Sequence, residues 1–204
     1  MEPLHIFFHV ATLGRWESVY DQMIDTLENS GLLKNSTLHI SVVGDHFNKN
    51  VSRYDFVHQT NNVKQYEFPT LNLLWNHSQK NDGAILYLHT KGATRPGPTV
   101  DQWRDMMLHF TVKKWQRAIH YLHEYDAVGC NLQIQQNKNF FSGNFWWAGA
   151  KYIRSLPDPN LYMSSRIQGE MWIGMNPRAR FMNLHASKID HYKQYYPAEN
   201  YKHL

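Results

Sequence analysis

The chain has 204 residues, of which 42% are hydrophobic and 14% aromatic, and this composition excludes an intrinsically disordered polypeptide. The length is sufficient for one sizeable domain with its own hydrophobic core and does not require a second. The formal net charge of +4 favours an anionic ligand only mildly, and no dense run of Lys and Arg indicates a nucleic-acid-binding track.

Disulfide formation, secretion and membrane insertion are each disfavoured by the sequence. Cys130 is the single cysteine, so no intrachain disulfide can form. The apolar segment Leu4–Ala11 is too short for a signal peptide and contains His5 and His9. No apolar run approaches the ~20 residues of a membrane-spanning helix. We therefore expect a cytoplasmic protein without a membrane span. The segment Tyr201–Leu204 has no terminal feature, so further domains of a longer polypeptide stay open.

The N-terminal half predicts strands that alternate with helices. Apolar runs predict strands at Leu4–Val10, Thr37–Val43 and Ala84–Leu88. Apolar residues at helical spacing over Trp16–Leu27 predict a helix between the first two strands, which should therefore be parallel. A short helix is expected within Phe68–Trp75, and residues 45–65 are expected to be irregular.

The residue pattern of the C-terminal half differs from one segment to the next. Its first part predicts one long helix, from about Asp101 to His123, followed by a strand at Asp126–Cys130. The segment Phe140–Ala148 is dense in aromatic and small residues, and Arg166–Gly174 predicts a short helix. The tail from Asn183 onwards is rich in His, Lys and Tyr, and no repeat or linker divides the chain. We therefore predict one α/β domain with a mostly parallel twisted sheet flanked by helices.

The most informative motif follows the third predicted strand. The apolar run Ala84–Leu88 changes abruptly to His89-Thr90-Lys91-Gly92, and Arg95 follows. Open α/β sheets bind ligands just beyond the carboxyl ends of their strands. Lys91 and Arg95 would place two cations there, and a glycine lets the backbone approach a ligand closely. This pattern predicts an anion site, and a phosphate group fits it.

The order of these motifs resembles the GT-A glycosyltransferases. Such enzymes carry an Asp-x-Asp signature after an apolar strand, and the corresponding place here reads Leu86-Tyr-Leu-His-Thr-Lys91. Their Asn-Ser/Ala-Gly motif is similar to Phe141-Ser-Gly-Asn-Phe-Trp-Trp147, and their late acidic residue is similar to Glu170. The resemblance implies a GT-A-like domain over residues 1–204. Residues 1–100 would form the nucleotide-sugar-binding half, and residues 101–204 the acceptor half.

The missing aspartates remove the usual oxygen ligands of a divalent metal. Two replacements stay open. Lys91, with Arg95, can neutralise the donor diphosphate directly, each charge-assisted bond contributing roughly 1.5–3 kcal/mol. Alternatively, His89 can ligate Mn²⁺ or Mg²⁺ together with His185 or His191 from the tail.

The resemblance also implies a set of site residues. Glu170, in an apolar setting, would be the catalytic base and Lys91 would assist the leaving group. Acceptor binding is expected at Gly143, Asn144, Trp146 and Trp147, where the Trp rings would either stack on sugars or serve the core. The expected donor-binding residues are His9, Val10, Ala11, Thr12, Phe68, Asn72, Trp75, His89, Thr90, Lys91 and Arg95.

The function implied by this resemblance is transfer of a sugar from a nucleoside-diphosphate sugar to a glycan or glycoprotein hydroxyl. A UDP-sugar is the expected donor, and inversion is the expected stereochemical outcome if Glu170 acts as base. Two other classes stay open: a non-catalytic carbohydrate-binding module that uses the Trp-rich segment, and a nucleotide or nucleic-acid binder. A His-rich metal hydrolase is a weaker alternative.

Overall fold

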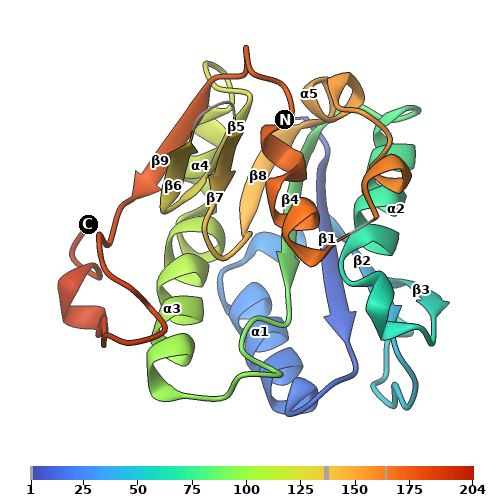
Figure 1. The fold of residues 1–204 in the computed structure, drawn as a ribbon, viewed down its shortest axis with the longest axis horizontal. Helices are drawn as coiled ribbons and strands as arrows, with labels where there is room; N and C mark the ends of the chain where they lie inside the picture. The colour runs from blue at the N-terminus through green and yellow to red at the C-terminus, as the bar shows by residue number, and fades with distance from the viewer. Residues whose placement is uncertain (1, 136–137, 164) are drawn as a thin grey trace.

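The computed structural model describes residues 2–135, 138–163 and 165–204 and shows one α/β domain built on a central sheet (Figure 1). The sheet has seven strands in the order β3-β2-β1-β4-β8-β5-β9. Their bounds are β1 (Leu4–Ala11), β2 (Ser36–Val43), β3 (Asp55–Thr60), β4 (Ala84–His89), β5 (Ala127–Cys130), β8 (Trp146–Gly149) and β9 (Phe181–His185). Strand β8 runs antiparallel to β4 and β5, and the other neighbouring pairs are parallel. The predicted mostly parallel sheet is therefore confirmed.

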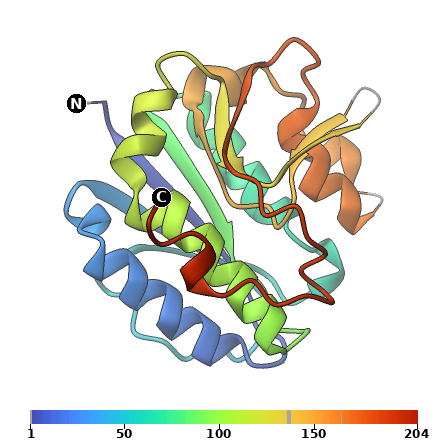
Figure 2. The same ribbon diagram turned by 90° about the vertical axis from the view of Figure 1, so that its left-hand side faces the viewer.

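Helices cover both faces of the sheet. The α-helices are α1 (Trp16–Asn29), α2 (Phe68–Ser78), α3 (Pro98–Leu108), α4 (Trp115–Tyr121), α5 (Ala150–Ser155) and α6 (Arg166–Met171). The short helical turns are η1 (Leu32–Lys34), η2 (Val63–Gln65), η3 (His109–Lys113), η4 (Pro159–Tyr162), η5 (Trp172–Gly174) and η6 (Ala198–Asn200). Figure 2 shows α1, α3 and α4 on one face and α2, α5 and α6 on the other. None of the described helices combines the length and apolar content needed to cross a membrane.

Alternation along β1 divides the core into two layers. Ile6, Phe8 and Val10 pack with α1 and α3 in one hydrophobic cluster, whereas Phe7 packs with α2 in the other. Successive side chains of a strand point to opposite faces, so the odd-numbered residues of β1 all face α2. His9 belongs to this set and contacts Thr70 on α2. The packing of β1 therefore decides which of its side chains meet α2.

The helix expected over Asp101–His123 is interrupted, which corrects that prediction. Helix α3 ends at Leu108, and η3 is a π-helical turn in which the Lys114 amide donates to the His109 carbonyl over 3.0 Å. Such wide turns occur as short interruptions of α-helices. Here the Thr111 carbonyl accepts a hydrogen bond from the Trp147 indole at 2.7 Å. The turn thus supplies an acceptor for a buried indole.

Five strands, namely β3, β6 (Leu132–Gln135), β7 (Lys138–Phe141), β8 and β9, have no counterpart among the predicted elements. β3 lies within the expected irregular segment 45–65, and its side chains are largely exposed, so no apolar alternation marks it. β9 lies at the opposite edge and pairs with β5. β6 and β7 form a separate two-stranded hairpin. These strands depend on pairing partners distant in the sequence, which local patterns do not reveal.

Two loops at the carboxyl edge of the sheet touch through Gly14. Gly14 has φ +60°, and a Cβ atom there would lie 2.2 Å from the Ala93 carbonyl oxygen. Gly31 has a similar φ of +73°, but a Cβ atom there would meet nothing within 4 Å. A non-glycine residue in this backbone region costs about 1–3 kcal/mol.

We therefore expect Gly31→Ala to lower the free energy of unfolding by about 1–3 kcal/mol, through backbone strain. Gly14→Ala should lower it further, because it adds a clash with backbone to the same strain. Urea unfolding of the two variants measures the difference. Equal losses would show that the contact between Gly14 and Ala93 adds nothing to stability.

Candidate active site

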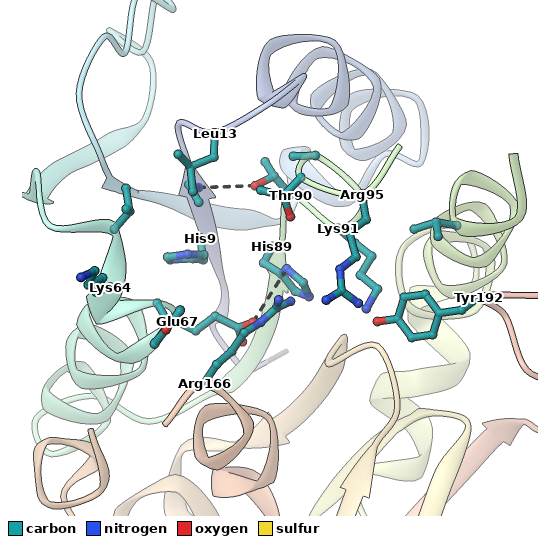
Figure 3. Close-up of a pocket in the computed structure, with 17 residues that line it drawn as sticks. His9, Leu13, Lys64, Glu67, His89, Thr90, Lys91, Arg95, Arg166 and Tyr192 are labelled. Carbon is teal, nitrogen blue, oxygen red and sulfur yellow. Dashed lines mark hydrogen bonds and ion pairs between the residues drawn. The ribbon is translucent and has the colours of Figure 1, made fainter. Parts of the chain in front are cut away.

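A pocket opens where the carboxyl ends of β1 and β4 lie side by side (Figure 3). The strand order reverses here, because β2 lies on one side of β1 and β4 on the other. Ligands of open α/β sheets bind at such a switch point. β1 contributes His9 and Ala11 to the lining, and the end of β4 contributes His89, Thr90 and Lys91.

Lys91 is a buried cation without a carboxylate partner. The residue is 5% exposed, and its ammonium lies 3.9 Å from the ring centroid of Trp103 and 5.7 Å from that of Tyr192. Within the described residues, no ion pair joins Lys91 to an acidic side chain. Aromatic faces attract the charge but do not neutralise it. A buried charge normally has an opposite partner, so the site is suited to an external anion.

Other cations surround the same pocket. Lys64, Arg95 and Arg166 line it together with Lys91, whereas Glu67 is the acidic residue of the described lining. Figure 3 shows Arg166 reaching from α6 towards His89, while Tyr192 approaches Lys91 from the C-terminal segment. Convergent basic side chains that include two guanidinium groups are well suited to phosphate oxygens.

Both histidines of the pocket are held neutral at neutral pH. Burial lowers the pKa of His9 to about 4. Burial, followed by the nearby Lys91 charge, lowers the pKa of His89 to about 3. Thr70 Oγ1 donates to Ser41 Oγ, so it accepts from His9 Nδ1 at 2.7 Å and leaves His9 Nε2 without a proton. His9 therefore offers a hydrogen-bond acceptor to the pocket.

Glu67 forms the polar floor between the two halves of the domain. It lies just before α2 and is 5% exposed. Its Oε2 accepts hydrogen bonds from the Tyr87 hydroxyl, at 2.9 Å, and from the Asn144 amide. His89 Nδ1 lies 4.0 Å from its Oε1, and His89 Nε2 bonds the Gly143 carbonyl at 3.0 Å. The network fixes His89 at the base of the pocket.

The turn that carries Lys91 is held from the opposite face. The buried Arg104 donates to the Lys91 carbonyl at 2.8 Å and pairs with Asp101 at 2.9 Å. Arg15 donates to the Gly92 carbonyl at 3.3 Å and also pairs with Asp101. Gly92 has φ +86°, a conformation that favours glycine. This preorganisation fixes the backbone of the cationic turn before any ligand arrives.

The structure gathers part of the predicted donor set into the pocket. The residues that line it are His9, Ala11, His89, Thr90, Lys91 and Arg95. Val10 faces the other core layer, and Phe68 is buried against the sheet. Thr12, Asn72 and Trp75 also lie outside the described lining, and the Trp75 indole donates to the Leu156 carbonyl.

The expected acceptor residues lie in the core beneath the pocket. Trp146 and Trp147 are both 0% exposed, and the Trp146 indole donates to Asn144 Oδ1 at 2.8 Å. A stacking platform needs an exposed ring face, so these positions do not fit the platform role that we expected. Gly143 and Asn144 contribute instead through the bonds to His89 and Glu67.

Glu170 lies on α6, one helical turn after Arg166, and is half-buried. Residues spaced by four share a helix face, so Glu170 and Arg166 project on the same side of α6. Behind the larger effect of burial, the Glu170 charge acts to raise the pKa values of both Tyr87 and His89. It stands outside the described lining itself.

The donor set at His89 is incomplete for a divalent metal among the described residues. His89 and Glu67 offer two ligand atoms 4.0 Å apart, and Lys91 lies beside them. No third His, Cys, Asp or Glu of the described chain joins them in a compact group of ligand atoms. His185 bonds the Tyr196 hydroxyl, and His191 bonds Ser187. The tail histidines are therefore engaged with neighbours of their own.

Comparison with known proteins supports the fold and leaves the activity open. Residues 9–201 match the family described as "Domain of unknown function (DUF8361)". The chain belongs to this family. A similar solved structure comes from Desulfovibrio desulfuricans G20, a protein whose assignment as a nucleotide-diphospho-sugar transferase is itself an inference. The TM-score is 0.51 at 12% identity, covering 91% of this chain and 81% of that one, so the likeness concerns the fold. No functionally curated protein matches the DUF8361 chain.

Sequence reasoning missed several lining residues of this DUF8361 domain. Lys64, Tyr66, Glu67, Arg166 and Tyr192 reach the pocket from η2, the start of α2, α6 and the tail. One weak indication of Glu67 was present in the sequence, because an acidic residue just before a helix that starts with proline often interacts with the helix N-terminus. The others belong to segments without a local motif, and tertiary packing alone brings them to the strand ends.

Tyr87→Phe removes one donor from the buried Glu67 carboxyl group and leaves the ring packing intact. We expect the free energy of unfolding to fall by about 1–3 kcal/mol, because a buried acceptor loses a partner. Tyr152→Phe is the matched control, since its buried hydroxyl donates to the Ile173 carbonyl, a neutral acceptor. Thermal and urea unfolding measure both variants. A smaller loss for Tyr87→Phe than for Tyr152→Phe would contradict the importance of the Glu67 network.

Proposed function

We propose that this chain is a glycosyltransferase that uses a nucleoside-diphosphate sugar, with UDP as the expected nucleotide, and a glycan or glycoprotein hydroxyl as acceptor. The observation that carries the proposal is the buried Lys91 ammonium at the end of β4, which has no acidic partner among the described residues. A nucleotide-sugar transferase-like fold, seen also in the similar solved structure, supports the same class.

In this proposal the diphosphate lies between Lys91, Arg95 and Arg166, which line one pocket. These cations stabilise the negative charge that develops as the bond between the anomeric carbon and the diphosphate oxygen breaks. The nucleoside lies towards the end of β1, where the neutral His9 offers an acceptor nitrogen. The site needs no carboxylate pair for this binding mode, which agrees with the His-Thr-Lys sequence at the strand end.

The acceptor hydroxyl oxygen attacks the anomeric carbon from the face opposite the diphosphate. Glu170 takes the hydroxyl proton as the new carbon–oxygen bond forms, and the diphosphate leaves with the bonding electron pair. This in-line displacement inverts the anomeric configuration. Glu170 lies on α6, the helix that also contributes Arg166 to the pocket.

Calorimetric titration with UDP, GDP and CMP, each with Mn²⁺ and each with EDTA, tests the donor site. We expect UDP to bind in EDTA, and Lys91→Ala to weaken binding roughly ten- to 150-fold, the equivalent of one charge-assisted bond. Lys80→Ala, an exposed lysine on the loop before β4, is the control and should bind as the wild type does.

The other outcomes of this titration are equally informative. If UDP binding requires Mn²⁺, the diphosphate contact would be assigned to a metal ion held by His89 and not to Lys91. Absence of binding by any nucleotide would overturn the transferase proposal. It would favour the carbohydrate-binding module, although the buried Trp146 and Trp147 rings do not support that class.

Glu170→Gln separates catalysis from binding. We expect it to abolish release of UDP from UDP-sugars in the presence of acceptor, while UDP affinity stays within twofold of wild type, since the amide cannot take a proton. Glu199→Gln, an exposed carboxylate in η6, is the control. Wild-type turnover by Glu170→Gln would remove this residue from the mechanism.

A further inference from the structure

Three histidines from three separate elements converge on the face of the sheet that α2 covers. His5 comes from β1, His39 from β2 and His77 from the end of α2. One ligand nitrogen of each lies within 4.8 Å of the other two. No part of the proposed donor site uses them, because they lie at the opposite end of α2. His5 and His9 are four residue steps apart on β1, a distance of about 13 Å along the strand.

One pair already has the spacing of metal ligands. His5 Nδ1 and His39 Nε2 are 3.3 Å apart. Zinc–nitrogen bonds of about 2.0–2.1 Å in tetrahedral geometry place two nitrogens roughly 3.3–3.4 Å apart. A separation of 3.3 Å is long for a hydrogen bond. It is the separation expected for two nitrogens that bind the same metal ion. His5 and His77 rings also meet edge to face, with centroids 4.3 Å apart.

His77 supplies the third nitrogen. Its Nε2 is buried and has no hydrogen-bond partner among the described residues. Its Nδ1 lies 3.4 Å from the Asn81 amide nitrogen, so Nε2 is the atom left for another contact. A buried polar atom without a partner costs about 1–3 kcal/mol, and such atoms in folded proteins usually mark a missing ligand or water.

Asp55 orients one of the three rings. Its Oδ2 lies 3.1 Å from His39 Nδ1, and holding the proton on Nδ1 leaves the lone pair on Nε2, the atom that faces His5. Carboxylates contact zinc-binding histidines in this way in many proteins. The Phe7 ring stacks on the His39 ring, with 4.4 Å between ring centroids, and gives the cluster an apolar base. The site thus has three ligands, an orienting carboxylate and a fixed base.

The electrostatics of the cluster favour neutral ligands. Burial lowers the pKa values of His5 and His39, and burial together with the two neighbouring histidines lowers the pKa of His77 to about 4. Imidazole ligands of this kind suit zinc and related borderline divalent ions.

We propose that His5, His39 and His77 bind one Zn²⁺ ion that ties β1, β2 and α2 together, with a fourth position open to solvent. The site is separate from the donor pocket and does not depend on the glycosyltransferase proposal. The ion would hold the C-terminal end of α2 against the two strands, while the N-terminal end of α2 follows Glu67.

The experiment titrates Zn²⁺ into EDTA-treated and desalted full chain, with calorimetry and a competing chromophoric chelator as two readouts. We expect one Zn²⁺ per chain and a rise in the midpoint of thermal unfolding. His77→Ala should lower affinity at least 100-fold, and Asp55→Ala should lower it about 10- to 100-fold, the range for residues that orient a ligand. His123→Ala, an exposed histidine after α4, should bind as the wild type does.

Substitution with Co²⁺ provides a signature that a merely structural role of these histidines would not produce. The wild type should show the visible absorption of tetrahedral cobalt, and His77→Ala and His39→Asn should lose it while keeping the wild-type circular dichroism spectrum. Failure of the folded wild type to bind Zn²⁺ stoichiometrically would overturn the proposal. Wild-type Zn²⁺ affinity in the folded His77→Ala and His39→Asn variants would also overturn it. Unchanged UDP affinity in His77→Ala would confirm that the two sites are independent.

Discussion

The parallel pairing of β1 with β4 is the constraint on which the site depends. The two strands run in register from Leu4 opposite Ala84 to His9 opposite His89, so they end at the same level. Beyond that point the chain continues into α1 after β1 and into α3 after β4, and both helices pack on the same face of the sheet. The Arg15 amide donates to the Ala93 carbonyl and holds the two turns together. A crevice with polar groups at its base follows from this geometry.

The charge of this crevice is unusual because its most buried cation has aromatic rather than acidic neighbours. Lys91 faces Trp103 and Tyr192, and its carbonyl is fixed by Arg104. The neutral His9 and His89 add no competing positive charge, since burial lowers their pKa values. The fold therefore maintains an unneutralised ammonium at a preorganised turn, which is costly in a free protein and favourable once an anion binds.

Helix α2 connects this crevice with the histidine cluster at its far end. Thr70, near its start, contacts His9 and Ser41, and His77, near its end, lies against His5 and His39. The spacing of seven residues places Thr70 and His77 on one helix face. The same two strands thus meet α2 twice, once beside the pocket and once at the cluster.

The sequence by itself determined the elements whose signal is local. The apolar runs of β1, β2 and β4 and the helical spacing of α1 predicted the parallel unit, and the polar break at His89-Thr90-Lys91 marked the strand end at which the pocket opens. These features depend on neighbouring residues and on burial, so periodicity records them. The tertiary structure alone decided the rest. It buried Trp146 and Trp147, added β3 and β9 as edge strands, and brought Arg166, Tyr192 and the three histidines of the cluster together. These outcomes depend on contacts between residues far apart in the chain, which no local pattern encodes.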